Sequence, residues 1–288
     1  MSKIAILTDT NSGLTEEQAK ELGVYVLPMP YIINDVTYLE GQDMTMSEFF
    51  DELTNKDNQV STSQPTPESV MNMWDEILKE NDYIVHIPMS SGLSGTCQTA
   101  MMLSGEEQYE GKVFVANNQR ISITMRQAVL DALELVKLGK SAEEIKTILE
   151  AEKLESSIYI MVDTLVYLKK GGRITPMAAM LGEMIKLKPV LQIQGEKLDA
   201  FAKARTIKQA KSIMMEAIQK DIETRFGGAD NVHIAVAHTN NEENAEQFKQ
   251  ELLEIFPNND IYVDRLPTSI AVHIGPGSLA VGCSKYIN

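Results

Sequence analysis

Hydroxyl side chains and glycines are concentrated in one short segment, residues 90–96, which read SSGLSGT. The segment follows an apolar run at 83–87 that predicts a strand, and it precedes a predicted helix over 96–104. The start of a helix offers free backbone N–H groups, which together with hydroxyls favour an anion. Gly92 and Gly95 would allow a ligand to approach the main chain closely. The same residues could also form a serine-rich helix cap with nothing bound.

A second polar segment, STSQPTP at residues 61–67, has a similar position before a predicted helix. Thr66 as the N-cap and Pro67 at the first helical position explain its end without any function. Thr62, Ser63 and Gln64 are then left in a loop that could point toward the same crevice. A loop without a ligand is the alternative interpretation.

The third segment, SIAVHIGPG at residues 269–277, contains His273 between an apolar run and a turn forced by glycine and proline. A histidine in such a place is either a core residue or a ligand contact, whereas His86, His233 and His238 are interpreted as core residues. Gly275, Gly277 and Ala280 have the spacing of a loosened dinucleotide fingerprint. We reject that match, because Pro276 lacks an amide and too little chain follows for a βαβ unit.

Cations beside a glycine pair form the fourth segment, KKGGRITP at residues 169–176. In so acidic a chain they could bind a phosphate or a partner, or they could form a solvated loop. The methionines within 177–185 recur at helical spacing, which is typical of a core and also suits a pocket for a flexible chain.

The elements that must position these segments alternate between strands and helices. Strands are expected at 4–8, 83–87 and 113–116, and helices at 96–104 and 122–138. Capping boxes begin two further helices, at Thr15 with Gln18 and at Ser141 with Glu144. This order predicts βαβ units and a mainly parallel sheet, with a ligand crevice at the carboxyl ends of the strands.

The pattern changes near residue 155. Strands are expected at 157–162, 190–194, 232–237 and 261–263, with helices over 206–226 and 242–255. We therefore expect an α/β protein with two domains. Residues 1–155 would form a Rossmann-like domain around a doubly wound, mainly parallel sheet. Residues 156–288 would form a smaller α/β domain that lines a ligand pocket between the two.

Composition excludes several classes of partner. The formal net charge of -15 disfavours nucleic acid and anionic membranes. The sequence shows no signal peptide and no run of about 18 apolar residues that could span a membrane, so a cytoplasmic location is expected. Cys97 and Cys283 lie far apart, outside any metal-ligand spacing. We expect no metal and no cofactor.

Taken together, these segments resemble the DegV family, which includes the fatty-acid-binding subunits of bacterial fatty acid kinase. The resemblance covers nearly the whole chain and depends on the order and spacing of short motifs. The motifs are Thr8-Asp9, Thr62-Ser63-Gln64-Pro65, Ser91-Gly92-Leu93-Ser94-Gly95-Thr96, Lys170-Gly171-Gly172-Arg173-Ile174, Ala204-Arg205-Thr206, and His273 before Gly275-Pro276-Gly277.

The resemblance implies a carrier of one long-chain fatty acid such as palmitate, without chemistry of its own. Thr62 and Ser94 would hydrogen-bond the carboxylate, His273 and Arg205 would join the same polar network, and the acyl chain would run into the second domain. Arg173 falls where the family is thought to contact its kinase partner, to which the carboxylate would be presented for acyl-phosphate formation. Two positions depart from the family pattern, with Ile274 in place of threonine and Ile207 in place of arginine.

A serine hydrolase using Ser94 and His273 is the alternative from another class. Residues 92–96 lack the last glycine of a G-x-S-x-G elbow, and only Asp9 or Asp163 could serve as the third member of a triad. A third possibility is a regulatory or scaffolding protein with lipid as a structural ligand.

Overall fold

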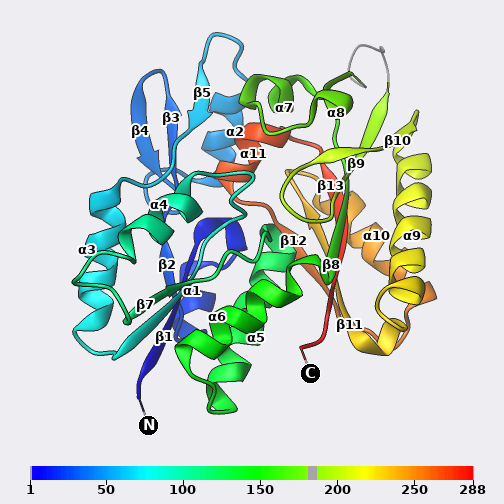
Figure 1. The fold of residues 1–288 in the computed structure, drawn as a ribbon. Coiled ribbons are helices and arrows are strands. Elements are labelled where there is room, and N and C mark those ends of the chain that lie inside the picture. The colour runs from blue at the N-terminus through cyan, green and yellow to red at the C-terminus, as the bar shows by residue number, and fades with distance from the viewer. Residues whose placement is uncertain (1, 181–186, 288) are drawn as a thin grey trace.

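The computed structural model describes residues 2–180 and 187–287. Within these ranges the strands form three sheets (Figure 1). The first is a parallel sheet in the order β2-β1-β6-β7, made of β1 (Ile4–Asp9), β2 (Tyr25–Leu27), β6 (Tyr83–Ile87) and β7 (Val113–Val115). Across the described ranges no helix is both long and apolar enough to cross a membrane.

Successive residues of the first sheet point to opposite faces, and both faces are covered by helices. Ala5 and Ile84 pack against α3 (Pro67–Leu78) and α4 (Thr96–Leu103). Ile6 and Val85 pack against α5 (Ser122–Lys137) and α6 (Ala142–Ala151). This arrangement confirms the predicted doubly wound parallel sheet.

The predicted helix boundaries agree with the observed caps. Thr15 begins α1 (Glu16–Leu22) with a complete capping box, and Ser141 begins α6 in the same way. The hydroxyl of Thr66 accepts a hydrogen bond from the amide of Ser69, with Pro67 at the first helical position of α3. Local sequence therefore determines where these helices start.

A small antiparallel sheet between β2 and α3 was not predicted. It has the order β4-β3-β5 and consists of β3 (Pro30–Ile33), β4 (Val36–Leu39) and β5 (Val60–Thr62). Asn34 and Asp35 form the β3–β4 turn with positive φ angles of 49° and 67°, as a tight hairpin requires. This sheet and α2 (Met46–Thr54) pack against α11 (Thr268–Ile274), so the end of the chain returns to its first third.

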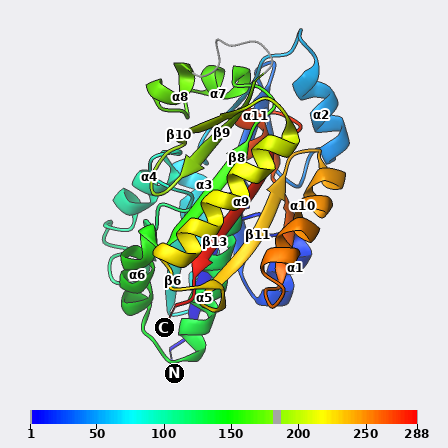
Figure 2. The ribbon, with the colours of Figure 1, turned by 90° about the vertical axis from the view of Figure 1, so that its right-hand side faces the viewer.

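The strands of the third sheet all follow residue 155 in the described ranges. Its order is β10-β9-β8-β13-β11-β12, and only the β11–β12 pair is parallel. Figure 2 shows two helices, α9 (Ile207–Thr224) and α10 (Glu242–Ile255), over one face. The opposite face packs against the start of α5. We therefore propose that the boundary between the two domains lies at residues 155/156. The strands are β8 (Ser156–Met161), β9 (Lys188–Ile193), β10 (Asp199–Ala204), β11 (Val232–His238), β12 (Ile261–Arg265) and β13 (Leu279–Lys285).

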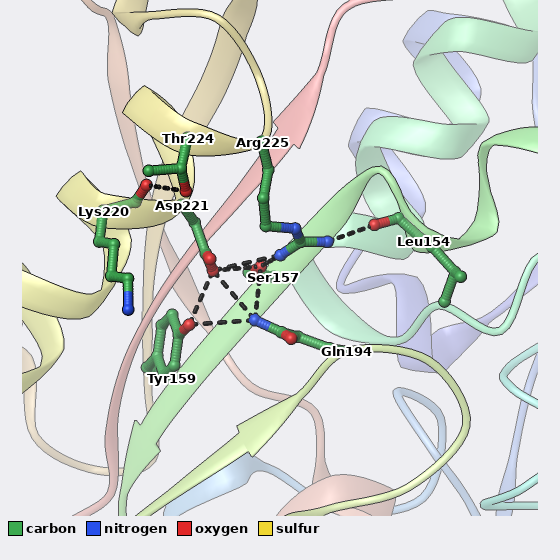
Figure 3. A network of polar contacts seen from close by, with 8 residues as sticks. All are labelled: Leu154, Ser157, Tyr159, Gln194, Lys220, Asp221, Thr224 and Arg225. Atoms are coloured by element: carbon green, nitrogen blue, oxygen red, sulfur yellow. Dashed lines mark hydrogen bonds and ion pairs between the residues drawn. The ribbon is translucent and has the colours of Figure 1, made fainter.

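A polar network around the buried carboxylate of Asp221 fastens α9 to this sheet (Figure 3). One carboxylate oxygen of Asp221 accepts hydrogen bonds from Ser157 Oγ at 2.6 Å and Tyr159 OH at 2.7 Å. The same oxygen accepts one from Gln194 Nε2 at 3.0 Å and pairs with Arg225 at 3.2 Å. Because these groups come from β8, the end of β9 and α9, the network fixes the helix against the sheet.

Candidate functional site

A cavity lies between the first and third sheets, beyond the carboxyl ends of β1 and β6. Its empty space is about 790 Å³, counting the part open to solvent. The walls come from both halves of the chain, and the lining residues are Asn11, Met29, Thr62, Ser63, Gln64, Met89, Leu93, Ser94, Gly95, Ile121, Leu168, Arg173, Leu198, Ser269, Ile270, His273 and Ile274.

Three of the predicted site residues, Thr62, Ser94 and His273, meet at this cavity. Thr62 Oγ1 lies 2.7 Å from His273 Nε2, which joins the end of β5 to α11. Ser94 Oγ accepts a hydrogen bond from the amide of Thr96 at 3.2 Å and lies 2.9 Å from that residue's hydroxyl. The loops before α3 and α4 therefore both present hydroxyls to one space.

His273 is neutral at ordinary pH. Burial, reinforced by the positive charge of Arg173, lowers the pKa of its imidazole to about 4. Its Nδ1 atom is buried and has no hydrogen-bond partner within the described residues. A Cβ atom at Gly171 would lie 2.2 Å from Nδ1, so glycine is required for the ring to take this position.

Arg173 is the one charged side chain among the described residues that line the cavity. It follows α7 (Val166–Gly171) and is half-buried, and its Nη1 donates a hydrogen bond to the carbonyl of Gly171 at 2.5 Å. From the sequence, Arg173 was expected to contact a protein partner. Its proximity to His273 was not predicted, because it depends on how α7 packs against α11.

The structure does not bring Arg205 to this cavity. Leu198, just before β10, lines the cavity, whereas Arg205 follows the other end of that strand and is exposed. At about 3.3 Å per residue the strand separates the two positions by roughly 20 Å. The backbone amide of Arg205 donates a hydrogen bond to Gln209 Oε1, at 2.9 Å.

Apolar side chains form much of the remaining cavity wall, beside the polar residues Asn11, Ser63, Gln64 and Ser269. Met89, Leu93 and Ile121 come from the first half of the chain, and Leu168 and Ile270 come from the second. All five belong to one cluster between the first and third sheets. Of the predicted methionine stripe at 177–185, Met177 in α8 (Pro176–Met180) is 67% exposed, and residues 181–186 lie outside the described ranges.

Sequence reasoning missed a buried polar network behind the cavity. Ser269 Oγ lies 2.7 Å from Glu40 Oε2 and 2.9 Å from Asn11 Oδ1. Asn11 Nδ2 donates to Asp9 Oδ1 at 2.7 Å, and burial raises the pKa of Asp9 to about 6. The only advance signal was the position of Asp9 directly after the first strand. Nothing near Glu40 indicated that it would contact α11.

The geometry does not support the hydrolase alternative. His273 Nε2 is directed to Thr62, and no hydrogen bond joins Ser94 to His273 among the contacts of the described residues. Neither proposed third residue orients the histidine, because Asp9 binds Asn11 and the amide of Met89, and Asp163 pairs with Lys188. In the described ranges, moreover, no cluster of three or more acidic, histidine or cysteine side chains could hold a metal.

Comparisons with known proteins agree with this architecture. The profile of the DegV family, described as "Uncharacterised protein, DegV family", matches residues 3–285. A DegV domain-containing protein of Staphylococcus aureus is 30% identical over 281 residues, covering 98% of each chain. A fatty-acid-binding DegV family protein from Thermus thermophilus superposes with a TM-score of 0.89 at 29% identity, covering 99% of this chain and 100% of that one. DegV of Bacillus subtilis, described as a fatty acid binding protein, gives a TM-score of 0.87 at 27% identity, with the same coverage. The chain therefore belongs to the DegV family.

Proposed function

We propose that this protein binds one long-chain fatty acid, such as palmitate, in the cavity between its sheets. The observation that carries the proposal is the arrangement of the cavity, in which hydroxyls from two loops and one cation adjoin an apolar wall. The carboxylate would lie at Thr62 and Ser94, with the acyl chain along the wall. The fatty-acid-binding proteins from Thermus thermophilus and Bacillus subtilis with the same fold support this assignment.

Thr62 is a hydrogen-bond donor to the ligand in this proposal. Neutral His273 carries one proton, and a proton on Nδ1 would be a buried donor without a partner. We therefore assign the proton to Nε2, which then donates to Thr62 Oγ1. The Thr62 proton is left free to point toward a carboxylate in the cavity. His273 acts through Thr62 in this arrangement.

Arg173 supplies the positive charge that the neutral imidazole cannot. A carboxylate taken out of water requires compensation by donors or an opposite charge. The formal charge of -15 repels anions from the protein as a whole, whereas the guanidinium of Arg173 attracts an anion to the cavity. We therefore include Arg173 in the head-group site. Its contact with a protein partner stays a prediction.

The acyl chain should supply most of the affinity. A dozen buried methylenes at about 0.8 kcal/mol each contribute on the order of 10 kcal/mol before other costs. Each hydrogen bond to the carboxylate adds about 1.5–3 kcal/mol, and association costs about 4–15 kcal/mol. The head-group residues therefore determine orientation and chemical selectivity more than total affinity.

We further propose that the bound carboxylate is presented to a separate ATP-dependent fatty acid kinase, which forms the acyl-phosphate. Resemblance to kinase-associated members of the family motivates this step. Kinetics with purified kinase test it, because acyl-phosphate should form faster when the fatty acid is delivered by this protein. Equal rates with free fatty acid would contradict presentation.

Mass spectrometry of an organic extract of the purified protein tests ligand binding itself. The expected result is about one fatty acid per chain, and after delipidation a titration with palmitate should restore it. Protein that neither retains nor rebinds any fatty acid would disprove the proposal. Decanol and methyl palmitate, which have no carboxylate, serve as controls for binding that depends on the apolar wall alone.

A further inference from the structure

Glu40 is a buried carboxylate that joins the first part of the chain to the helix carrying His273. It follows β4 and is 7% exposed. Its Oε1 accepts hydrogen bonds from Thr268 Oγ1 at 2.5 Å and from the amide of Ser269 at 3.1 Å. Its Oε2 accepts from Thr10 Oγ1 at 2.5 Å and contacts Ser269 Oγ at 2.7 Å. Three of these four contacts are with the first two residues of α11.

These contacts fix the first turn of α11, the helix that carries the cavity-lining residues Ser269 and His273. Ser269 and His273 are four residues apart, so they lie one above the other on the same face of the helix. Both line the cavity. The other side of α11, with Ala271 and Val272, packs against the small sheet and α2. A displacement of the first turn would therefore be transmitted directly to His273.

His273 has little of its own to hold it in place. Thr62 is the single hydrogen-bond partner recorded for its ring in the described ranges, and Nδ1 has none. The close approach to Gly171 restrains the ring on one side. The position of Nε2 relative to Thr62 thus depends on where α11 lies, and Glu40 fixes its first turn.

We propose that Glu40 is a positioning residue for the ligand carboxylate. By binding the start of α11 it holds His273 in register with Thr62, and so directs the Thr62 proton into the cavity. The expected effect of Glu40 on fatty-acid affinity rests on the proposed function. Its expected effect on the position of the His273 ring applies to the ligand-free protein and does not depend on that function.

The test compares Glu40→Gln with Glu68→Gln, the same change at an exposed position of α3. Glutamine keeps the size of the side chain but replaces one acceptor by a donor that faces hydroxyl groups. Dissociation constants are measured for palmitate and for hexadecanol, which has the same chain length without the carboxylate. Long-range ¹H–¹⁵N spectra of the ligand-free proteins report the tautomer and hydrogen bond of His273.

We expect Glu40→Gln to weaken palmitate binding by about tenfold or more and hexadecanol binding by less than about threefold, with shifted His273 ring signals. Glu68→Gln should match the wild type in all three measurements. Palmitate binding within about twofold of wild type, or equal weakening of both ligands, would overturn the proposal.

Two further outcomes remain decisive. If the wild-type protein binds no fatty acid, the proposed function fails, and the His273 signals alone decide whether Glu40 positions the ring. If Glu40→Gln does not fold, Thr268→Ala is used instead. It removes one donor to Glu40 at a residue that does not line the cavity. It should change the ring signals and the palmitate affinity in the same direction by a smaller amount, and unchanged values would refute the role of Glu40.

Discussion

Replacing Thr62 with valine removes one hydroxyl and keeps the branched shape of the side chain. In the proposed complex this hydroxyl donates to the carboxylate, and a hydrogen bond to a charged group contributes about 1.5–3 kcal/mol. Because about 1.4 kcal/mol corresponds to a tenfold change in Kd, the Kd for palmitate should rise roughly 10- to 140-fold. The substitution also deprives His273 Nε2 of its partner at 2.7 Å, so the free energy of unfolding should fall by about 1 kcal/mol.

Isothermal titration of delipidated protein with palmitate and hexadecanol measures this effect. Hexadecanol should lose less affinity, because its hydroxyl carries no charge. Thr37→Val is the matched control, since Thr37 is exposed on β4 of the same small sheet. Palmitate affinity of Thr62→Val within about twofold of the control would refute the assignment of Thr62 as a donor to the ligand.

Three other predictions concern the His273 ring and the attachment of α9 to the third sheet. Gly171→Ala should displace the His273 ring, because the added methyl carbon would lie 2.2 Å from Nδ1, and palmitate should bind about tenfold more weakly. Gly105→Ala, where the nearest atom is 3.5 Å away, should bind like the wild type, and equal affinities of the two variants would contradict this fit. Since the folded-state pKa of His273 is lowered to about 4, the unfolded chain binds more protons between about pH 4 and 6.5. The free energy of unfolding should thus rise with pH across that window relative to His273→Gln, whereas parallel curves would show that the imidazole is not desolvated. Asp221→Ala should lower the free energy of unfolding by about 1–3 kcal/mol in urea titrations, because it removes the ion pair with Arg225 and leaves three other donors without this acceptor. A loss below about 1 kcal/mol would mean that water replaces the carboxylate.

The first half of the fold could be predicted because its signals are local. Apolar runs such as 83–87 and caps such as Thr15 with Gln18 act within a few residues. The alternation of strands and helices then leaves a doubly wound sheet as the arrangement that covers both faces. The small sheet escaped prediction, because β3, β4 and β5 have only three or four residues each. Strands this short do not show a clear period of two in their apolar residues. They also pack against α11, which lies far away in the sequence.

The sequence predicted which segments contribute to the site, but it did not predict all of the side chains that lie close together there. Motif order indicated that Thr62, Ser94 and His273 act together, and the structure places them at one cavity. Arg205 belongs to the same family pattern, but the length of β10 carries it to the far end of the strand. Arg173 was expected to contact a partner, and the packing of α7 against α11 places it beside His273.

By itself, the sequence determined the fold class, the starts of the capped helices α1, α3 and α6, and the segments that supply hydroxyls, because these signals lie within a few residues of each other. Only the tertiary structure decided which side chains meet. Thr62 and His273 are 211 residues apart, and Glu40 and Ser269 are 229 residues apart. No periodicity connects such positions. They come together because burying the apolar faces of the small sheet and α11 brings the end of the chain back to its beginning.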